Sequence, residues 1–267
     1  MAVKITLGNA KGGVGKTLIT NFLAYHLAEM DYKVLVIDCD PQGNTTGLFE
    51  KKIGSLNEIQ TLYQGLKNKN LKSCIKAVSD NLAFISSSTD LVKLDDLLKG
   101  QKDKVSFFAK QIVEFNDEYD FIFFDVPPSP YSIYVNNALG ASDYFGIITE
   151  IGSDSFKGIP TFYEVANNIH ENFNKNLEFL GIIVNRREND VETFAKIDSE
   201  YNLEGDEFFV NYIPKRSRLF KYMEHGVYNY TVKKGALNPL DRWDLELYAI
   251  GEKLAKELLG KLELGVK

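Results

Sequence analysis

The sequence has little of what would cross-link a chain, bind zinc or hold it in a membrane. Its 267 residues include two cysteines and three histidines, and neither cysteine belongs to a C-x-x-C pattern. We therefore expect no disulfide framework and no zinc site. The chain has no run of eighteen or more apolar residues, and its N-terminus enters a strand pattern without a charged and then apolar leader. These absences favour a cytoplasmic protein and argue against a membrane partner.

Positive charge is not in excess either. The chain carries 31 Lys and Arg against 37 Asp and Glu, a formal net charge of −6. This balance disfavours a protein that coats nucleic acid over its whole surface, but it leaves room for one basic face. The length suffices for one large α/β domain, and no repeat or low-complexity segment separates a second. We predict one domain over residues 1–267.

The N-terminus contains the pattern of a phosphate-binding loop. An alternating, β-branched segment from Val3 to Leu7 predicts a strand, a glycine-dense loop follows, and a helical pattern begins at Thr17. Residues Ala10 to Thr17 fit G-x-x-x-x-G-K-[ST], except that Ala replaces the first Gly. In such a loop Lys16 reaches the β- and γ-phosphates and the Thr17 hydroxyl binds Mg²⁺. The alternative is a glycine-rich turn that merely precedes Lys-Thr.

Two further predicted strands end in acidic residues. The run from Lys33 to Asp38 continues as Cys-Asp-Pro-Gln-Gly-Asn, and the run from Phe121 to Asp125 continues as Val-Pro-Pro-Ser. Open α/β sheets bind ligands at the carboxyl ends of their strands, so these acids face the ligand crevice. Asp125 fits a Walker B acid that holds Mg²⁺ through water. For Asp40, helix capping is the structural alternative.

The rest of the chain alternates between strand and helix patterns. Strands are expected at 82–85, 144–149, 179–184 and from 208, and helices near 91–98, 105–115, 155–171 and 241–259. This alternation predicts an α/β fold, a doubly wound and mostly parallel sheet flanked by helices. Residues 49–104 are expected to form a peripheral helical segment with one strand, and the last helix is expected to pack on the domain.

The three motifs together resemble a known family. Lys11 to Thr17, Asp38 to Asn44 and Asp125 to Ser129 are similar to the motifs of ParA-type ATPases, the deviant Walker A class of P-loop NTPases with K-G-G-x-G-K-[ST]. The resemblance implies ATP and Mg²⁺ as cofactors and an ATP-dependent homodimer in which Lys11 reaches the partner subunit's nucleotide. The catalytic residues it implies are Lys11 and Lys16, which stabilise charge on the transferring phosphoryl group, and Asp40, which positions the attacking water. It also implies that Asp38 contacts the Mg²⁺ shell.

The resemblance also assigns the nucleotide contacts. They lie in the loop and in two later segments: Lys11, Gly12, Gly13, Val14, Gly15, Lys16, Thr17, Leu18, Asn185, Pro214 and Arg216. Family members carry an Asn that hydrogen-bonds adenine where this chain has Asn185, although an Asn after a strand is often only a turn residue. The segment at Pro214 corresponds to one that packs beside the adenine. Lys215 stands there in place of the family's Arg.

The part after Pro214, residues 214–267, is the most basic of the chain. Its candidate DNA contacts are Lys215, Arg216, Arg218, Lys221, Lys233 and Lys234. ParA-like proteins bind DNA through basic residues in this part when ATP holds them as dimers. Contacts to phosphates give affinity without reading sequence. An ordinary solvated surface is the alternative.

The function implied by the resemblance is ATP-dependent partition of a plasmid or similar element. A centromere-binding, ParB-like adaptor would stimulate a weak ATPase, and the dimer would associate with the nucleoid. The chain resembles the short form that lacks an N-terminal helix-turn-helix.

Three alternatives remain. A MinD-like membrane-cycling ATPase would have a more uniformly basic last helix than one with Glu252 and Glu257. An electron carrier like the nitrogenase iron protein would need bridging cysteines. A ligase such as dethiobiotin synthetase would need a second substrate.

Overall fold

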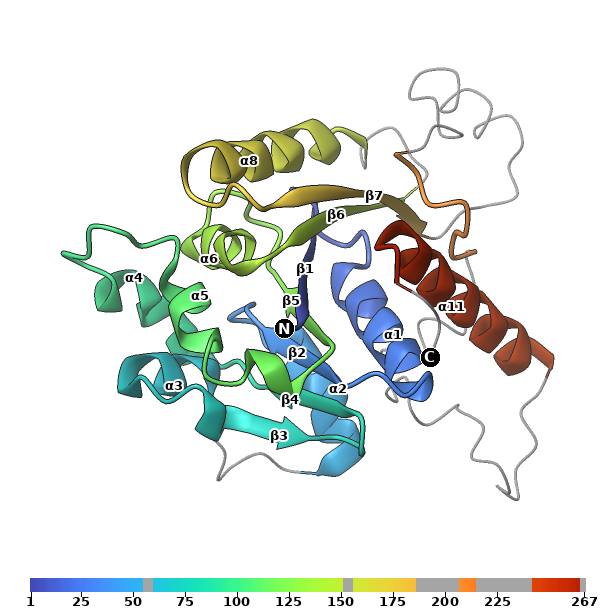
Figure 1. Ribbon diagram of the computed structural model, residues 1–267, viewed down its shortest axis with the longest axis horizontal. Coiled ribbons are helices and arrows are strands. Elements are labelled where there is room, and N and C mark those ends of the chain that lie inside the picture. The colour runs from blue at the N-terminus through green and yellow to red at the C-terminus, as the bar shows by residue number, and fades with distance from the viewer. Residues whose placement is uncertain (55–59, 151–155, 186–206, 215–241, 265–267) are drawn as a thin grey trace.

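A seven-stranded sheet organises the computed structural model, which describes residues 1–54, 60–150, 156–185, 207–214 and 242–264 (Figure 1). The strand order is β3-β4-β2-β5-β1-β6-β7. Every neighbouring pair is parallel except β3 with β4. The strands are β1 (Val3–Gly8), β2 (Val34–Asp38), β3 (Ile75–Ala77), β4 (Leu82–Ile85), β5 (Phe121–Asp125), β6 (Tyr144–Glu150) and β7 (Glu178–Asn185). The predicted fold class is confirmed.

Helices cover both faces of this sheet (Figure 1). They are α1 (Lys16–Glu29), α2 (Asn44–Ile53), α3 (Leu62–Asn68), α4 (Leu94–Leu97), α5 (Phe107–Ile112), α6 (Ile133–Ala141), α8 (Gly158–Asn172) and α11 (Arg242–Lys261), with short 3₁₀ turns between some of them. Apolar side chains of α1, α2 and α11 share one buried cluster with one side of the sheet. Those of α3, α4, α5, α6 and α8 share a second cluster with the other side.

Strand β5 explains why the central strands read as unbroken apolar runs. Phe121 and Phe123 belong to the α1 side, whereas Ile122 and Phe124 belong to the other side. All four side chains are buried. A strand covered on both faces needs apolar residues at every position, so alternation disappears from the sequence.

Helix α11 packs on α1 and closes that face of the sheet (Figure 1). Leu247, Leu254 and Leu258 are buried in the cluster that also holds α1. The two helices approach closely because Gly251 has no side chain: a Cβ there would lie 2.1 Å from Nε2 of His26. The last helix therefore packs as predicted. Among the described helices, none is both long and apolar enough to cross a membrane.

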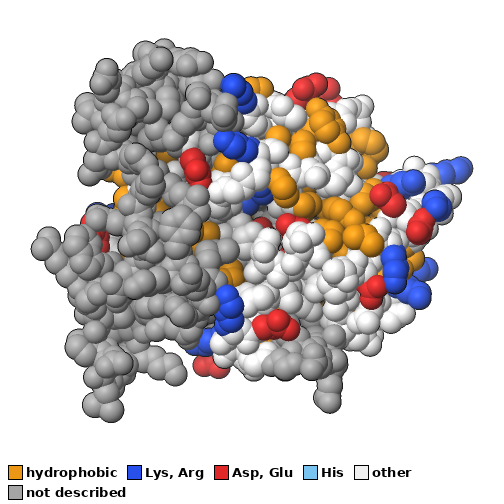
Figure 2. Space-filling model, turned by 180° about the vertical axis from the view of Figure 1, so that it is seen from behind, with side chains coloured by type: hydrophobic (Ala, Val, Ile, Leu, Met, Phe, Trp, Pro, Cys, Tyr) orange, Lys and Arg blue, Asp and Glu red, His pale blue; other side chains and the backbone are white. Residues whose placement is uncertain are grey.

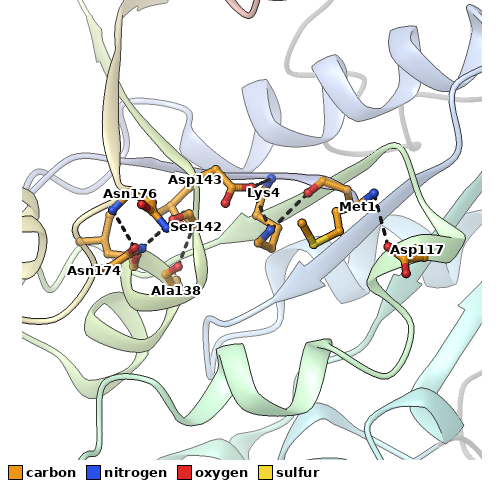
Figure 3. Close-up of polar contacts among 11 residues, drawn as sticks. Met1, Lys4, Asp117, Ala138, Ser142, Asp143, Asn174 and Asn176 are labelled. Atoms are coloured by element: carbon orange, nitrogen blue, oxygen red, sulfur yellow. Dashed lines mark hydrogen bonds and ion pairs between the residues drawn. The ribbon is translucent and has the colours of Figure 1, made fainter.

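Polar contacts hold the amino ends of β1 and β6 in place (Figure 3). The Lys4 backbone N–H donates to Oδ2 of Asp143 over 2.9 Å, and the Lys4 ammonium lies 2.9 Å from the same oxygen. The Ser142 hydroxyl donates to the Ala138 carbonyl, and Asn174 Nδ2 donates to the Ser142 carbonyl over 2.7 Å. These contacts hold the start of β6 beside β1.

Several elements differ from the sequence prediction. The peripheral segment holds two strands instead of one, because β3 pairs antiparallel with β4 at the sheet edge. No helix was predicted at the positions of α2 and α6, whereas α3 lies within the predicted peripheral helical segment. The strand predicted from Phe208 is reduced to one bridge with Ile182, and a further backbone hydrogen bond joins Ile213 to Val184. This segment follows β7 without forming a regular ladder.

Candidate nucleotide and metal site

The loop between β1 and α1 is shaped to surround a phosphate. Gly15 occupies the N-cap of α1 with φ +92°, a left-handed conformation that favours glycine. Asn9 anchors the loop, since its Nδ2 donates to the Ile148 carbonyl and its Oδ1 accepts from the Lys11 N–H, each over 2.8 Å. The Lys16 ammonium donates to the Lys11 carbonyl over 2.9 Å. Both predicted lysines therefore belong to one compact loop at a helix N-terminus.

The Lys16 side chain is largely shielded from solvent. Only 7% of the residue is exposed, and burial lowers the pKa of its ammonium, while the negative charges of Asp125 and Asp40 oppose this shift. The structure thus brings together residues that are far apart in the sequence. The Lys16 ammonium lies near carboxylates and near the N–H groups at the start of a helix. Such a place suits an anion that binds together with a metal ion.

Two carboxylates lie side by side where β2 and β5 end. Asp38 and Asp125 are register partners in the parallel ladder, and both are fully buried. Burial raises the pKa of Asp38 to about 8, with the charge of Asp125 as the next cause. Burial also raises the pKa of Asp125 to about 6, although hydrogen bonds from Thr45 and Thr17 oppose the shift. Such a pair is stabilised by a nearby cation.

The donor set around these carboxylates fits Mg²⁺. The Thr17 hydroxyl donates to Oδ1 of Asp125 over 3.3 Å, so the predicted metal ligands Thr17, Asp38 and Asp125 lie at one place. In the described part of the chain, no three His, Cys, Asp or Glu side chains gather into a metal-binding group. Mg²⁺ needs no such cage, because it takes one or two carboxylates and fills its octahedron with water and phosphate oxygens.

Asp40 lies beside this pair but makes a different local contact. The residue is 7% exposed, and its Oδ1 accepts from the Gln42 N–H over 2.9 Å. The N-cap of α2 is Gly43, so Asp40 does not cap that helix. Its carboxylate remains close enough to Lys16 to act on the pKa of that residue.

The other predicted nucleotide contacts lie in different surroundings. Asn185 ends β7 and is fully buried, and its Nδ2 donates to the Val14 carbonyl over 2.8 Å. A Cβ on Gly15 would lie 2.2 Å from that Nδ2, so Asn185 lies directly against the loop. The side chains of Val14 and Leu18 point into the apolar cluster of α1, which leaves only their backbone for a nucleotide. Pro214 is half-buried.

Sequence reasoning missed the polar residues that hold the carboxylates. Thr46 donates from both its N–H and its hydroxyl to Oδ2 of Asp38, over 2.8 and 2.7 Å. Thr45 donates to Oδ2 of Asp125 over 2.8 Å. The available signal was their position directly after the Asp-Pro-Gln-Gly-Asn segment, where α2 begins.

The predicted DNA contacts lie outside the described residues, as does Arg216 in its nucleotide role. These residues are Lys215, Arg216, Arg218, Lys221, Lys233 and Lys234. On the face seen in Figure 2, the described side chains carry charges of both signs. Some described lysines pair with neighbouring acids, for example Lys93 with Asp90 and Lys110 with Asp103.

The family follows from comparison with known proteins. The family model described as an AAA domain matches residues 2–179, two thirds of the chain and all of the site apart from Asn185 and the segment at Pro214. The chain belongs to this family, as a ParA-type P-loop ATPase. The resemblance read from the three motifs is thereby confirmed.

Individual relatives match this chain over different shares of its length. The chromosome-partitioning ATPase Soj of Treponema pallidum is 27% identical, and the match covers 98% of each chain. The cell division protein PomZ of Myxococcus xanthus is 31% identical over 66% of this chain and 55% of its own length. The crystal structure of a plasmid partition protein from Borrelia burgdorferi superposes with a TM-score of 0.69 and 26% identity, covering 84% of this chain and 96% of that one.

Proposed function

We propose that this ParA-type ATPase uses ATP to partition a plasmid or similar DNA element. The observation that carries the proposal is the assembly of Lys16 and Lys11 in one loop opposite Asp38, Asp40 and Asp125. The similarity to the partitioning ATPase Soj over 98% of both chains supports it. The paired buried carboxylates, whose pKa values are raised, would be stabilised by a bound divalent cation.

Each charged side chain has a role in the proposed hydrolysis. Thr17 and Asp125 would hold Mg²⁺, with Asp38 against its hydration shell, and the ion would offset charge on the β- and γ-phosphate oxygens. Lys16 stabilises negative charge on the phosphoryl group as it is transferred. Asp40 orients the attacking water. Because Asp40 and Lys16 already interact electrostatically, the water and the phosphate would meet between them.

We further infer that ATP joins two copies of the chain and that only this dimer binds DNA. Lys11 of each copy would reach the phosphates of the other. Binding without sequence preference would come from contacts between lysine or arginine and phosphate in the part after Pro214. A centromere-binding, ParB-like adaptor would stimulate the slow hydrolysis, after which the dimer opens and leaves the nucleoid.

A DNA titration tests this proposal. Binding to a random-sequence duplex is measured with ATP, with ADP and without nucleotide, each at two salt concentrations. We expect binding only with ATP and a steep loss of affinity at the higher salt, because counterions are released from neutralised phosphates. Equal binding in all three nucleotide states, or binding in none, would refute the DNA-binding role.

A pair of lysine variants separates dimerisation from nucleotide binding. Lys11→Ala should keep part of its ATP affinity and lose the ATP-dependent dimer, measured by light scattering after size exclusion. Lys16→Ala should lose ATP binding itself. The Lys16 ammonium is held against the phosphate loop, where it would contact the β- and γ-phosphates. An ATP-dependent dimer that persists in Lys11→Ala contradicts the shared site.

A second candidate is a membrane-cycling ATPase of the MinD type, which would position the cell-division machinery. The similarity to the cell division protein PomZ favours a cell-division role. Sedimentation with anionic vesicles, with ATP and with ADP, distinguishes the two candidates. Co-sedimentation that depends on ATP, together with no DNA binding, would favour the membrane cycle.

A further inference from the structure

The first turn of α2 holds both buried carboxylates through two adjacent threonines. Thr45 donates to Asp125, and Thr46 donates to Asp38. The Thr46 hydroxyl also accepts from the Ser87 N–H over 2.8 Å, so its role extends to the loop after β4. The hydroxyl of Thr45, by contrast, is hydrogen-bonded to Asp125 and to Asn21 on α1.

The Thr45 hydroxyl has a fixed direction of donation. Asn21 Nδ2, on α1, lies 2.6 Å from Thr45 Oγ1 and 2.7 Å from the Thr17 carbonyl. A carbonyl can only accept, so the nitrogen of the Asn21 amide must face it, and the same NH₂ group supplies its second proton to Thr45. The hydroxyl proton of Thr45 is then left for Oδ2 of Asp125, 2.8 Å away.

These contacts form a closed ring around one side of the site. From Asp125 it passes through Thr45 to Asn21, then to the carbonyl of Thr17, whose own hydroxyl returns to Oδ1 of Asp125. Thr45, Asn21 and Asp125 are each at most 1% exposed. Water therefore does not compete for the two hydrogen bonds of the Thr45 hydroxyl, whereas those of the half-buried Thr17 are only partly shielded. Each oxygen of the Asp125 carboxylate accepts from one threonine hydroxyl.

We propose that Thr45 is a positioning residue for the proposed Mg²⁺ site. Its hydroxyl holds Asp125 in the orientation that the ion requires, and Asn21 sets the direction of that hydroxyl. The proposal rests on the proposed function, because it concerns the cation bound with ATP. Residues that orient a metal ligand affect metal affinity by about 10–100-fold when they are removed.

The test compares three variants with the wild-type chain. Thr45→Val removes the hydroxyl at nearly constant shape, and Thr45→Ser keeps it. Thr20→Val is the matched control. Thr20, on α1, is as buried as Thr45, and its hydroxyl has no hydrogen-bond partner within the described residues. The readout is binding of a fluorescent, non-hydrolysable ATP analogue, first in EDTA and then across a Mg²⁺ titration.

We expect the Mg²⁺ midpoint of Thr45→Val to rise by about tenfold or more, with unchanged affinity in EDTA. Thr45→Ser and Thr20→Val should stay within twofold of wild type. A wild-type midpoint in Thr45→Val, or a Thr45→Ser defect as large as that of Thr45→Val, would overturn the proposal. If circular dichroism shows that Thr45→Val does not fold, Thr45→Ala is measured against the same limits.

The wild-type titration distinguishes failure of the proposed cation site from failure of the proposed role of Thr45. If the wild-type chain binds the analogue equally with and without Mg²⁺, the proposed cation site itself fails. If it needs Mg²⁺ and Thr45→Val needs no more, only the role of Thr45 fails.

Discussion

His26 connects the protonation of one side chain to the packing of the last helix. Its ring lies between α1 and α11, with ring centroids 4.6 Å from Phe22 and 4.9 Å from Tyr248, both edge-on. Burial lowers the pKa of His26 from 6.5 to about 3. The folded chain therefore keeps this imidazole neutral at a pH where the unfolded chain already protonates it.

The sign and size of the effect follow from this difference. No stability is lost above pH 6.5, and stability falls as the pH drops from 6.5 toward 3, because protons bind preferentially to the unfolded chain. At pH 5 the loss relative to pH 7 is about 2 kcal/mol, and the full loss approaches about 5 kcal/mol near pH 3, at 1.36 kcal/mol per pKa unit. His26→Phe removes the titration and keeps an aromatic ring in the same space.

Urea unfolding followed by circular dichroism at pH 7 and pH 5 measures the effect. Other buried groups also titrate, and Asp38, with its raised pKa, acts in the opposite direction: its cost to stability grows as the pH rises. These terms are common to both chains, so the decisive quantity is the difference between wild type and His26→Phe. If the wild-type chain loses no more stability than the variant between pH 7 and pH 5, His26 is not held neutral and the reasoning is wrong.

Four further predictions concern packing, backbone conformation and base recognition. Leu254→Ala should lower the free energy of unfolding by about 2–5 kcal/mol in urea, since Leu254 is fully buried, whereas Val92→Ala, at a 59% exposed position, should change little. Gly47→Ala should raise the melting temperature, by a stabilisation of about 0.5–1 kcal/mol, because its Cβ meets nothing within 4 Å inside α2. Gly15→Ala should lower it and weaken ATP binding, because its Cβ would meet Asn185. Asn185→Ala should weaken ATP more than GTP if the residue reads adenine; calorimetry showing equal losses would leave it a support of the loop alone.

The parts of the fold that the sequence predicted share one physical cause. Strands β2 and β5 are buried on both faces, so each appears as an apolar run, and each ends in an acid at the carboxyl edge. The phosphate loop is equally local, since its glycines and Lys16 adjoin in the chain. Local patterns of this kind need no knowledge of distant partners.

The parts that were missed depend on partners far away in the chain. Strand β3 has three residues, two of them exposed, and takes its form from pairing with β4. The roles of Thr45 and Asn21 appear only when α1, α2 and β5 meet. The segment from Phe208 has strand-like composition, yet only one bridge joins it to β7, because composition does not determine pairing.

The order of the central strands determines how much of the chain must be synthesised before the site can form. The phosphate loop and Asp38 both belong to the first 40 residues, but β1 and β2 are not neighbours in the sheet; β5 lies between them. Asp125 is level with Leu7 on one side and with Asp38 on the other. A chain still being synthesised therefore carries the whole loop motif long before it has a site, because β5, the strand that joins the two halves, is made more than 80 residues after Asp38. ATP would then stabilise only chains whose central sheet is complete.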